Sequence, residues 1–167
     1  MIVTKEIRLQ TIVVALAGLL ACSPALARDK SLNGFDVSGS LVPAREIRSG
    51  GPGRDGIPAL LNPDFVTARK ATFLEADDRV IGLQLGGVAK AYPIRILNYH
   101  EIVNDRVGSI PVAVTFCPLC GTGVVFRADP GGQHRTFGVS GLLYNSNVLL
   151  YDRQSESLWS QLMYQAI

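Results

Sequence analysis

Two cysteines separated by two residues are the strongest candidates for chemistry in this sequence. Cys117 and Cys120 stand in the string Phe-Cys-Pro-Leu-Cys-Gly. This spacing brings both sulfur atoms to one side of a turn, close enough to form a disulfide or to bind one metal ion. Thiolates are soft ligands that suit Cu(I) or zinc. We therefore favour a soft-metal site, copper or zinc. A structural disulfide or buried thiols and a redox or reactive thiol are the two alternatives.

A third metal ligand has to come from elsewhere in the chain, and His100 is our candidate. It lies among the polar residues Asn98, Glu101 and Asp105, of which Glu101 or Asp105 could accept the second ring N–H of a ligating histidine. If residues 101–104 and 110–116 pair as a hairpin, the start of the first strand lies beside the end of the second, so His100 and Cys117 meet. The H-E-x-x-H spacing of zinc proteases is absent.

Several further polar residues are weaker candidates. Ser140, Tyr144 and Asn145 could form the polar wall of a pocket, although turn chemistry explains them as well. Asp152 and Arg153 are expected to form an ion pair at the end of a strand. Trp159 is expected to lie in the core, with a groove-lining position as the alternative.

Two other classes of function compete with metal binding. A thiol-based enzyme or redox protein would use Cys117 or Cys120 as nucleophile, His100 as base and Glu101 or Asn98 as orienting partner. A noncatalytic binding module would use the cysteine turn only as a structural feature. No residue can be assigned as catalytic from the sequence alone.

The elements that position these residues are mostly short strands. The sequence predicts strands at residues 80–85, 88–92, 101–104, 110–116, 122–127, 134–139, 147–151 and 158–161. Short helices are predicted at 62–70, with Asn62 as N-cap, and at 93–98. The fold class is therefore mainly β: an antiparallel barrel or sandwich built from hairpins, with one or two short helices.

Three regions divide the chain. Residues 1–27 resemble a secretory signal peptide, because Lys5 and Arg8 precede an apolar run of about ten residues that ends in Ala25-Leu26-Ala27. Residues 28–56 lack periodicity and predict an extended arm with turns. Residues 57–167 predict the β-rich domain, which ends on an apolar stretch and suggests a C-terminal truncation.

The leader predicts export to the periplasm or the extracellular space. Leu19-Leu20-Ala21-Cys22 offers a second interpretation, a lipoprotein anchored to the membrane at Cys22, and an uncleaved anchor is the least favoured one. The chain has 16 basic and 14 acidic residues and no basic stripe. This balance predicts no nucleic-acid partner, and protein partners cannot be named.

Four blocks of sequence resemble domain-of-unknown-function family 3179, a family of prokaryotic proteins. They are the blocks at residues 98–105, 116–122, 137–146 and 151–161, and residues 55–60 resemble the opening block of the family. The resemblance covers about residues 55–167. It implies no reaction, because the family has no assigned activity, so function has to be argued from the site.

Overall fold

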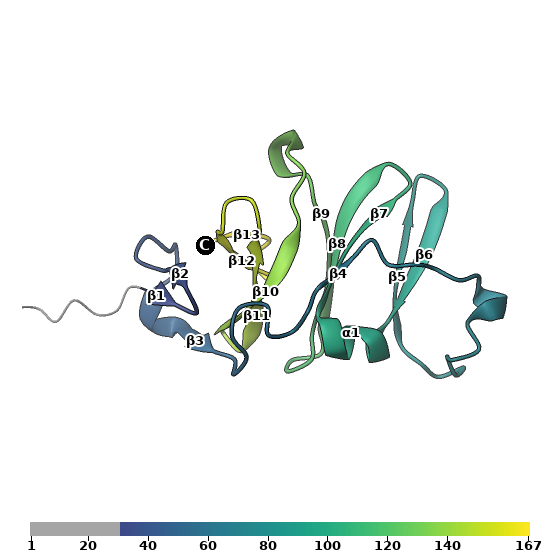
Figure 1. Ribbon diagram of the computed structural model, residues 1–167, viewed down its shortest axis with the longest axis horizontal. Coiled ribbons are helices and arrows are strands. Elements are labelled where there is room, and N and C mark those ends of the chain that lie inside the picture. Colours follow the sequence, from purple (N-terminus) through teal and green to yellow (C-terminus); the bar gives the residue numbers. More distant parts are fainter. Residues whose placement is uncertain (1–30) are drawn as a thin grey trace, which may run out of the picture.

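The computed structural model describes residues 31–167 (Figure 1). The predicted leader, including the alternative lipid-attachment residue Cys22, lies outside the described residues. Strands dominate the described part, and the helical elements are short. The strands are Ser31–Leu32 (β1), Phe35–Asp36 (β2), Ile47–Ser49 (β3), Leu60–Leu61 (β4), Val80–Leu85 (β5), Val88–Pro93 (β6), Ile102–Val107 (β7), Ile110–Cys117 (β8), Thr122–Arg127 (β9), Phe137–Tyr144 (β10), Asn147–Asp152 (β11), Leu158–Ser160 (β12) and Gln165–Ala166 (β13). One α-helix, Ile94–His100 (α1), and three 3-10 turns, Ala44–Glu46 (η1), Ala68–Lys70 (η2) and Pro130–Gly132 (η3), complete this part.

Two sheets form the centre of the molecule. The first has five strands in the order β13-β12-β11-β10-β3, all of them antiparallel. The second has four strands in the order β4-β7-β8-β9, in which only the β4–β7 pair is parallel. Among the described residues neither sheet closes into a barrel. The mainly β prediction is confirmed, with a sandwich-like arrangement of the two sheets.

Four layers follow one another along the long axis of the molecule (Figure 1). They are the segment with β1 and β2, the five-stranded sheet, the four-stranded sheet, and the β5–β6 hairpin with α1. The segment with β1 and β2 covers the outer face of the five-stranded sheet, where Phe35 and Val37 share a core with Leu149 and Tyr151. Between the two sheets lies a core that includes Ile102. The β5–β6 hairpin and α1 cover the far face of the four-stranded sheet.

Burial on both faces explains the apolar composition of the central strands. Every residue of β8 after Ile110 is buried, because this strand has a covered face on each side. The hairpin strand β5 instead alternates between exposed and half-buried residues, as expected for a strand with one solvent face. Gly86 and Gly87 join β5 to β6 with φ angles of 56° and 78°, a conformation that glycine adopts readily.

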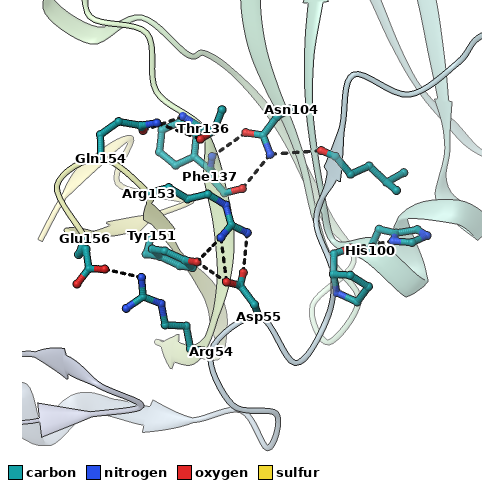
Figure 2. Close-up of polar contacts among 12 residues, drawn as sticks. Arg54, Asp55, His100, Asn104, Thr136, Phe137, Tyr151, Arg153, Gln154 and Glu156 are labelled. Atoms are coloured by element: carbon teal, nitrogen blue, oxygen red, sulfur yellow. Dashed lines mark hydrogen bonds and ion pairs between the residues drawn. The ribbon is translucent and has the colours of Figure 1, made fainter.

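One amide side chain joins the two sheets. The backbone N–H of Phe137 donates to Oδ1 of Asn104 at 2.6 Å, and Nδ2 of Asn104 donates to the carbonyl of Phe137 at 2.8 Å (Figure 2). The same Nδ2 also lies 3.3 Å from the carbonyl of Leu60. Because an amide supplies both a donor and an acceptor, Asn104 acts like an additional strand residue and fixes β10 relative to β7.

The predicted pairing of Asp152 with Arg153 is wrong, because each residue has a different partner. Arg153 donates to both carboxylate oxygens of Asp55, at 2.7 and 2.9 Å, and Tyr151 also donates to Asp55 (Figure 2). Asp152 is fully buried and pairs with Arg135 at 2.8 Å. Neighbouring residues of a strand point to opposite faces, which places these two charges in different layers.

The predicted helix at 62–70 is also wrong. Asn62 has a φ angle of 45°, the next residues are extended, and only η2 is helical. The helix predicted at 93–98 is present as α1, and the hairpin predicted around the two glycines is present as β5–β6. In the part of the chain that the structure describes, no helix has the length and apolar character needed to cross a membrane.

Residues 31–56, for which the sequence predicts an extended arm, contribute three short strands and buried side chains. Phe35, Val37, Val42 and Ile47 all have less than 7% of their surface exposed. The five-stranded sheet has an apolar outer face that needs cover, and this segment provides it.

Candidate functional site

The two cysteines lie in the turn between β8 and β9. Cys117 is the last residue of β8 and stands opposite Thr122, the first residue of β9. Gly121 closes the turn with a φ angle of 69° and donates its N–H to the carbonyl of Cys117 at 2.8 Å. A side chain at residue 121 would be strained in this conformation, so glycine is suited to the position.

The two thiols differ in exposure. Cys117 is buried, Cys120 is exposed, and neither takes part in a disulfide. Sγ of Cys120 lies 3.2 Å from the hydroxyl oxygen of Thr122, and Nδ2 of Asn147 donates to the same sulfur at 3.2 Å. Thr122 belongs to the four-stranded sheet and Asn147 to the five-stranded sheet, so the turn lies where the two sheets meet.

A buried chain of amide and hydroxyl groups supports Asn147. Its Nδ2 also donates to Oε1 of Gln161 at 2.7 Å, and Nε2 of Gln161 donates to the hydroxyl of Thr115 at 2.9 Å and to the carbonyl of Thr122 at 3.3 Å. Gln161 and Thr115 are fully buried, and Asn147 is 3% exposed. Buried amides with these partners have little freedom to rotate, so the N–H that faces Cys120 is held in place.

These contacts separate the acidities of the two thiols. Burial raises the pKa of Cys117, and its hydrogen bond with Cys120 raises that pKa further. Burial also opposes ionisation of Cys120, but hydrogen bonds from Thr122, Cys117 and Asn147 outweigh it and lower the pKa of Cys120 to about 7. Near neutral pH, about half of the Cys120 thiols are therefore thiolates.

His100 lies at the end of α1, before the start of β7. The register of β7 and β8 is the one expected for a hairpin, because Ile102 faces Thr115 and the N–H of Phe116 donates to the carbonyl of Glu101. The imidazole, however, has its Nδ1 2.8 Å from the carbonyl of Pro58 (Figure 2). Within residues 31–167, no group of three or more His, Cys, Asp or Glu side chains is arranged to hold a metal ion.

The polar residues around His100 point to different partners. Asp105 is buried and accepts hydrogen bonds from Lys90 at 2.7 Å and from Tyr92 at 2.9 Å. Glu101 ends α1 with a φ angle of 55°, and burial raises the pKa of its carboxyl group. Asn98 is exposed on the helix.

Ser140, Tyr144 and Asn145, the predicted polar wall of a pocket, lie in β10 and in the turn that follows it. Ser140 is fully buried, and its hydroxyl donates to the carbonyl of Leu149 and accepts the N–H of Leu142, which bridges a bulge in β10. Tyr144 packs against the core under β3, and Asn145 forms the β10–β11 turn with a φ angle of 49°. That turn leads directly to Asn147, the residue that contacts Cys120.

The sequence did not predict that Thr122 and Asn147 contact Cys120, or that Gln161 contacts Asn147. Thr122 could have been found, because it follows the cysteine turn by two residues. Asn147 lies 27 positions beyond Cys120 and reaches it only because the two sheets pack together, and Gln161 supports the site through its contact with Asn147. No local spacing indicates such a contact.

Thr122→Val is expected to make Cys120 less acidic. Valine keeps the shape and strand propensity of threonine but cannot donate to the thiolate, and a hydrogen bond to a charged group contributes about 1.5–3 kcal/mol. The pKa of Cys120 should rise from about 7 to about 8 or higher. The pH dependence of the iodoacetamide alkylation rate measures this pKa. Thr72→Val, at an exposed position away from the site, should leave the profile unchanged, and an unchanged profile in Thr122→Val would refute the assigned role of its hydroxyl.

The fold and the site define the class: a mainly β sandwich with a pair of unequal thiols at the junction of its two sheets. The sequence model of one family matches residues 54–167, and its description is protein of unknown function (DUF3179). The chain belongs to this family, which confirms the resemblance of its sequence blocks. Searches of the curated proteins and of the solved structures found no match.

Proposed function

We propose that the protein is a thiol–disulfide exchange protein in which Cys120 attacks and Cys117 resolves. The observation that carries this proposal is the asymmetry of the pair. One thiol is exposed and surrounded by hydrogen-bond donors, and the other is buried directly beside it. An attacking thiol has to be accessible and partly ionised at the working pH, whereas a resolving thiol only has to reach the first sulfur.

The reaction balances with a substrate disulfide as the oxidant. The Cys120 thiolate attacks one sulfur of the substrate disulfide, a Cys120–substrate disulfide forms, and the other substrate sulfur leaves as a thiolate. Cys117 then loses its proton to solvent and attacks Sγ of Cys120, which releases the second substrate thiolate. Two protein thiols are oxidised to a Cys117–Cys120 disulfide, and one substrate disulfide is reduced to two thiols.

The surrounding residues have separate roles in this scheme. Thr122 and Asn147 stabilise the attacking thiolate, and Gln161 is a positioning residue that orients Asn147. Pro118 restricts the turn between the sulfurs. The scheme assigns no step to His100, whose Nδ1 contacts the carbonyl of Pro58.

The predicted leader is consistent with this proposal but is not required by it. Export would place the protein outside the cytoplasm, where disulfides form and persist and where substrates of this class occur. Either form of export, by cleavage after Ala27 or with a lipid at Cys22, leads to the same compartment.

Oxidised glutathione tests the exchange directly. The reduced protein is expected to release two molecules of glutathione thiol for each chain and to lose the mass of two hydrogen atoms, as the Cys117–Cys120 disulfide forms. Mass spectrometry after acid quenching measures both. A protein that remains fully reduced, or that carries a stable glutathione adduct without the internal disulfide, would contradict the proposal.

The same protein preparation separates this proposal from a soft-metal site. Purification without chelator followed by elemental analysis should find less than one zinc ion for each chain, because the thiols supply only two ligands and structural zinc sites use four. One retained ion for each chain, lost in both Cys→Ser variants, would favour metal binding as the function of this pair.

A further inference from the structure

A large apolar cavity lies on the other side of the four-stranded sheet from the thiols. Its volume is about 770 Å³, within the range of about 300–1,000 Å³ that is usual for small-molecule sites. Its floor is formed by Leu97 and Val103, which are buried, and one wall is formed by β6. The opposite wall is the loop of residues 63–76, which we call the strap.

The cavity exists because the strap is irregular and carries small side chains. Ala68, Ala71 and Ala76 face the cavity where larger side chains would fill it. The strap is nevertheless held in place at both ends. The ring of Phe65 packs edge-on against Tyr92 with 5.5 Å between ring centroids, and Nη1 of Arg95 donates to the carbonyl of Phe73 at 2.6 Å.

The mouth of the cavity exposes more apolar surface than folding requires. Phe65, Val66 and Phe73 are 41%, 53% and 49% exposed, and all three belong to the strap and line the cavity. Large apolar side chains exposed around one cavity are typical of a binding site.

Within residues 31–167, three charged side chains line the cavity, those of Asp64, Glu75 and Lys90. The ammonium group of Lys90 is already engaged, because it donates to Asp105 and to the carbonyl of Arg106 and lies 4.1 Å from the centroid of Phe65. The hydroxyl of Tyr92 also donates to Asp105. The carboxylates of Asp64 and Glu75 line the cavity and have no ion pair or side-chain hydrogen bond among the described residues. Among the charged side chains that line the cavity, the unpaired charge is therefore negative; Arg69 and Lys70 of the strap do not line it.

We propose that this cavity binds an elongated apolar molecule that carries a positively charged head group. The chain of the ligand lies over Leu97 and Val103, covered by the strap, and its cationic head lies near Asp64 and Glu75. An anionic amphiphile of equal length is disfavoured, because the two carboxylates repel its head and the one lysine is neutralised by Asp105.

A matched series of twelve-carbon ligands tests the proposal. Dodecylammonium, dodecanol and dodecanoate share one chain and differ in head charge. Each is used to displace the dye Nile red from the full protein, the two ionic ligands below their micelle concentrations and dodecanol below its solubility limit. Dodecylammonium is expected to bind more tightly than dodecanoate by about tenfold, with dodecanol between them, which corresponds to about 1.4 kcal/mol.

Three variants test whether these ligands bind in the cavity. Ala71→Trp should fill the cavity and weaken all three ligands by about tenfold or more, while Ala44→Trp, an exposed site in η1 that does not line the cavity, should change none of them. Asp64→Asn combined with Glu75→Gln should remove the difference between the cationic and anionic ligands and retain dodecanol binding. Circular dichroism confirms that each variant is folded.

Three results would overturn the proposal. They are the absence of saturable displacement by any ligand, tighter binding of dodecanoate than of dodecylammonium, and unchanged binding in folded Ala71→Trp. The last result would place the dye elsewhere, for example in the smaller cavity of about 280 Å³ between Phe126 and Trp159.

Discussion

The Cys117→Ser protein is expected to accumulate a stable mixed disulfide at Cys120 when it meets a substrate disulfide. The attacking thiolate is intact in this variant, but no second thiol remains beside it to release the substrate. Treatment with oxidised glutathione should therefore add one glutathione for each chain, on the peptide that contains residue 120. Peptide mass spectrometry without reduction detects the adduct.

The Cys120→Ser protein is the matched control for the same reaction. Cys117 is buried and burial raises its pKa, so at pH 7 this thiol is less ionised than that of Cys120. We expect its reaction with glutathione disulfide to be slower than that of Cys117→Ser by at least about tenfold. Equal rates in the two variants would contradict the assigned roles, and a faster reaction of Cys120→Ser would reverse them.

The second large effect concerns stability. Asp152→Ala is expected to lower the free energy of unfolding by about 3 kcal/mol, because it leaves a partly buried guanidinium without its carboxylate. Asp152 is fully buried and accepts hydrogen bonds from Arg135 at 2.8 Å, from the indole N–H of Trp159 at 2.8 Å and from the N–H of Ser155 at 2.6 Å. Urea denaturation followed by tryptophan fluorescence measures the loss.

Asp129→Ala provides the comparison for Asp152. Asp129 also pairs with an arginine, Arg127, at 2.7 Å, but at the surface, so no measurable loss of stability is expected. A similar loss in both variants would mean that burial does not set the strength of these pairs.

The pH dependence of stability also follows from Asp152. Hydrogen bonds from Ser155 and Trp159, which outweigh the opposing effect of burial, lower the pKa of Asp152 in the folded protein. A carboxyl group with a lowered pKa stabilises the fold above its unfolded pKa, and this contribution is lost as the pH falls through the folded pKa. In Asp152→Ala, the part of the acid-induced loss of stability that comes from this carboxyl group should be absent.

The strands were predictable from the sequence because their patterns are local. The run of β-branched residues before Cys117 indicated a strand buried on both faces, and the two glycines at 86 and 87 indicated the hairpin turn. The strap was not predictable in the same way. Asn62 and Pro63 are common at the start of a helix, but Asn62 donates its backbone N–H to the carbonyl of Asn104 at the end of the β4–β7 pairing, and this tertiary contact outweighs the local preference.

The site was predictable only in part. The cysteine turn follows from its own sequence, whereas the low pKa of Cys120 depends on Asn147, which arrives from the other sheet. His100 looked like a partner because it is polar and close in register to the end of β8. Its contact with Pro58, 42 residues earlier in the chain, is one that no sequence spacing reveals.

The pairing of β3 with β10 sets an order of events during folding. Ile47 lies opposite Tyr144, and Asp55 is held by Arg153, 98 residues later. The segment that is synthesised first thus has its partners near the other end of the described chain and cannot reach its final place until almost all of that chain exists. Contacts between such distant residues form slowly, since a long loop must close before any of them is made. Residues 31–56 are therefore expected to reach their final place after the hairpins β5–β6, β7–β8 and β10–β11, whose partner strands are close in the sequence.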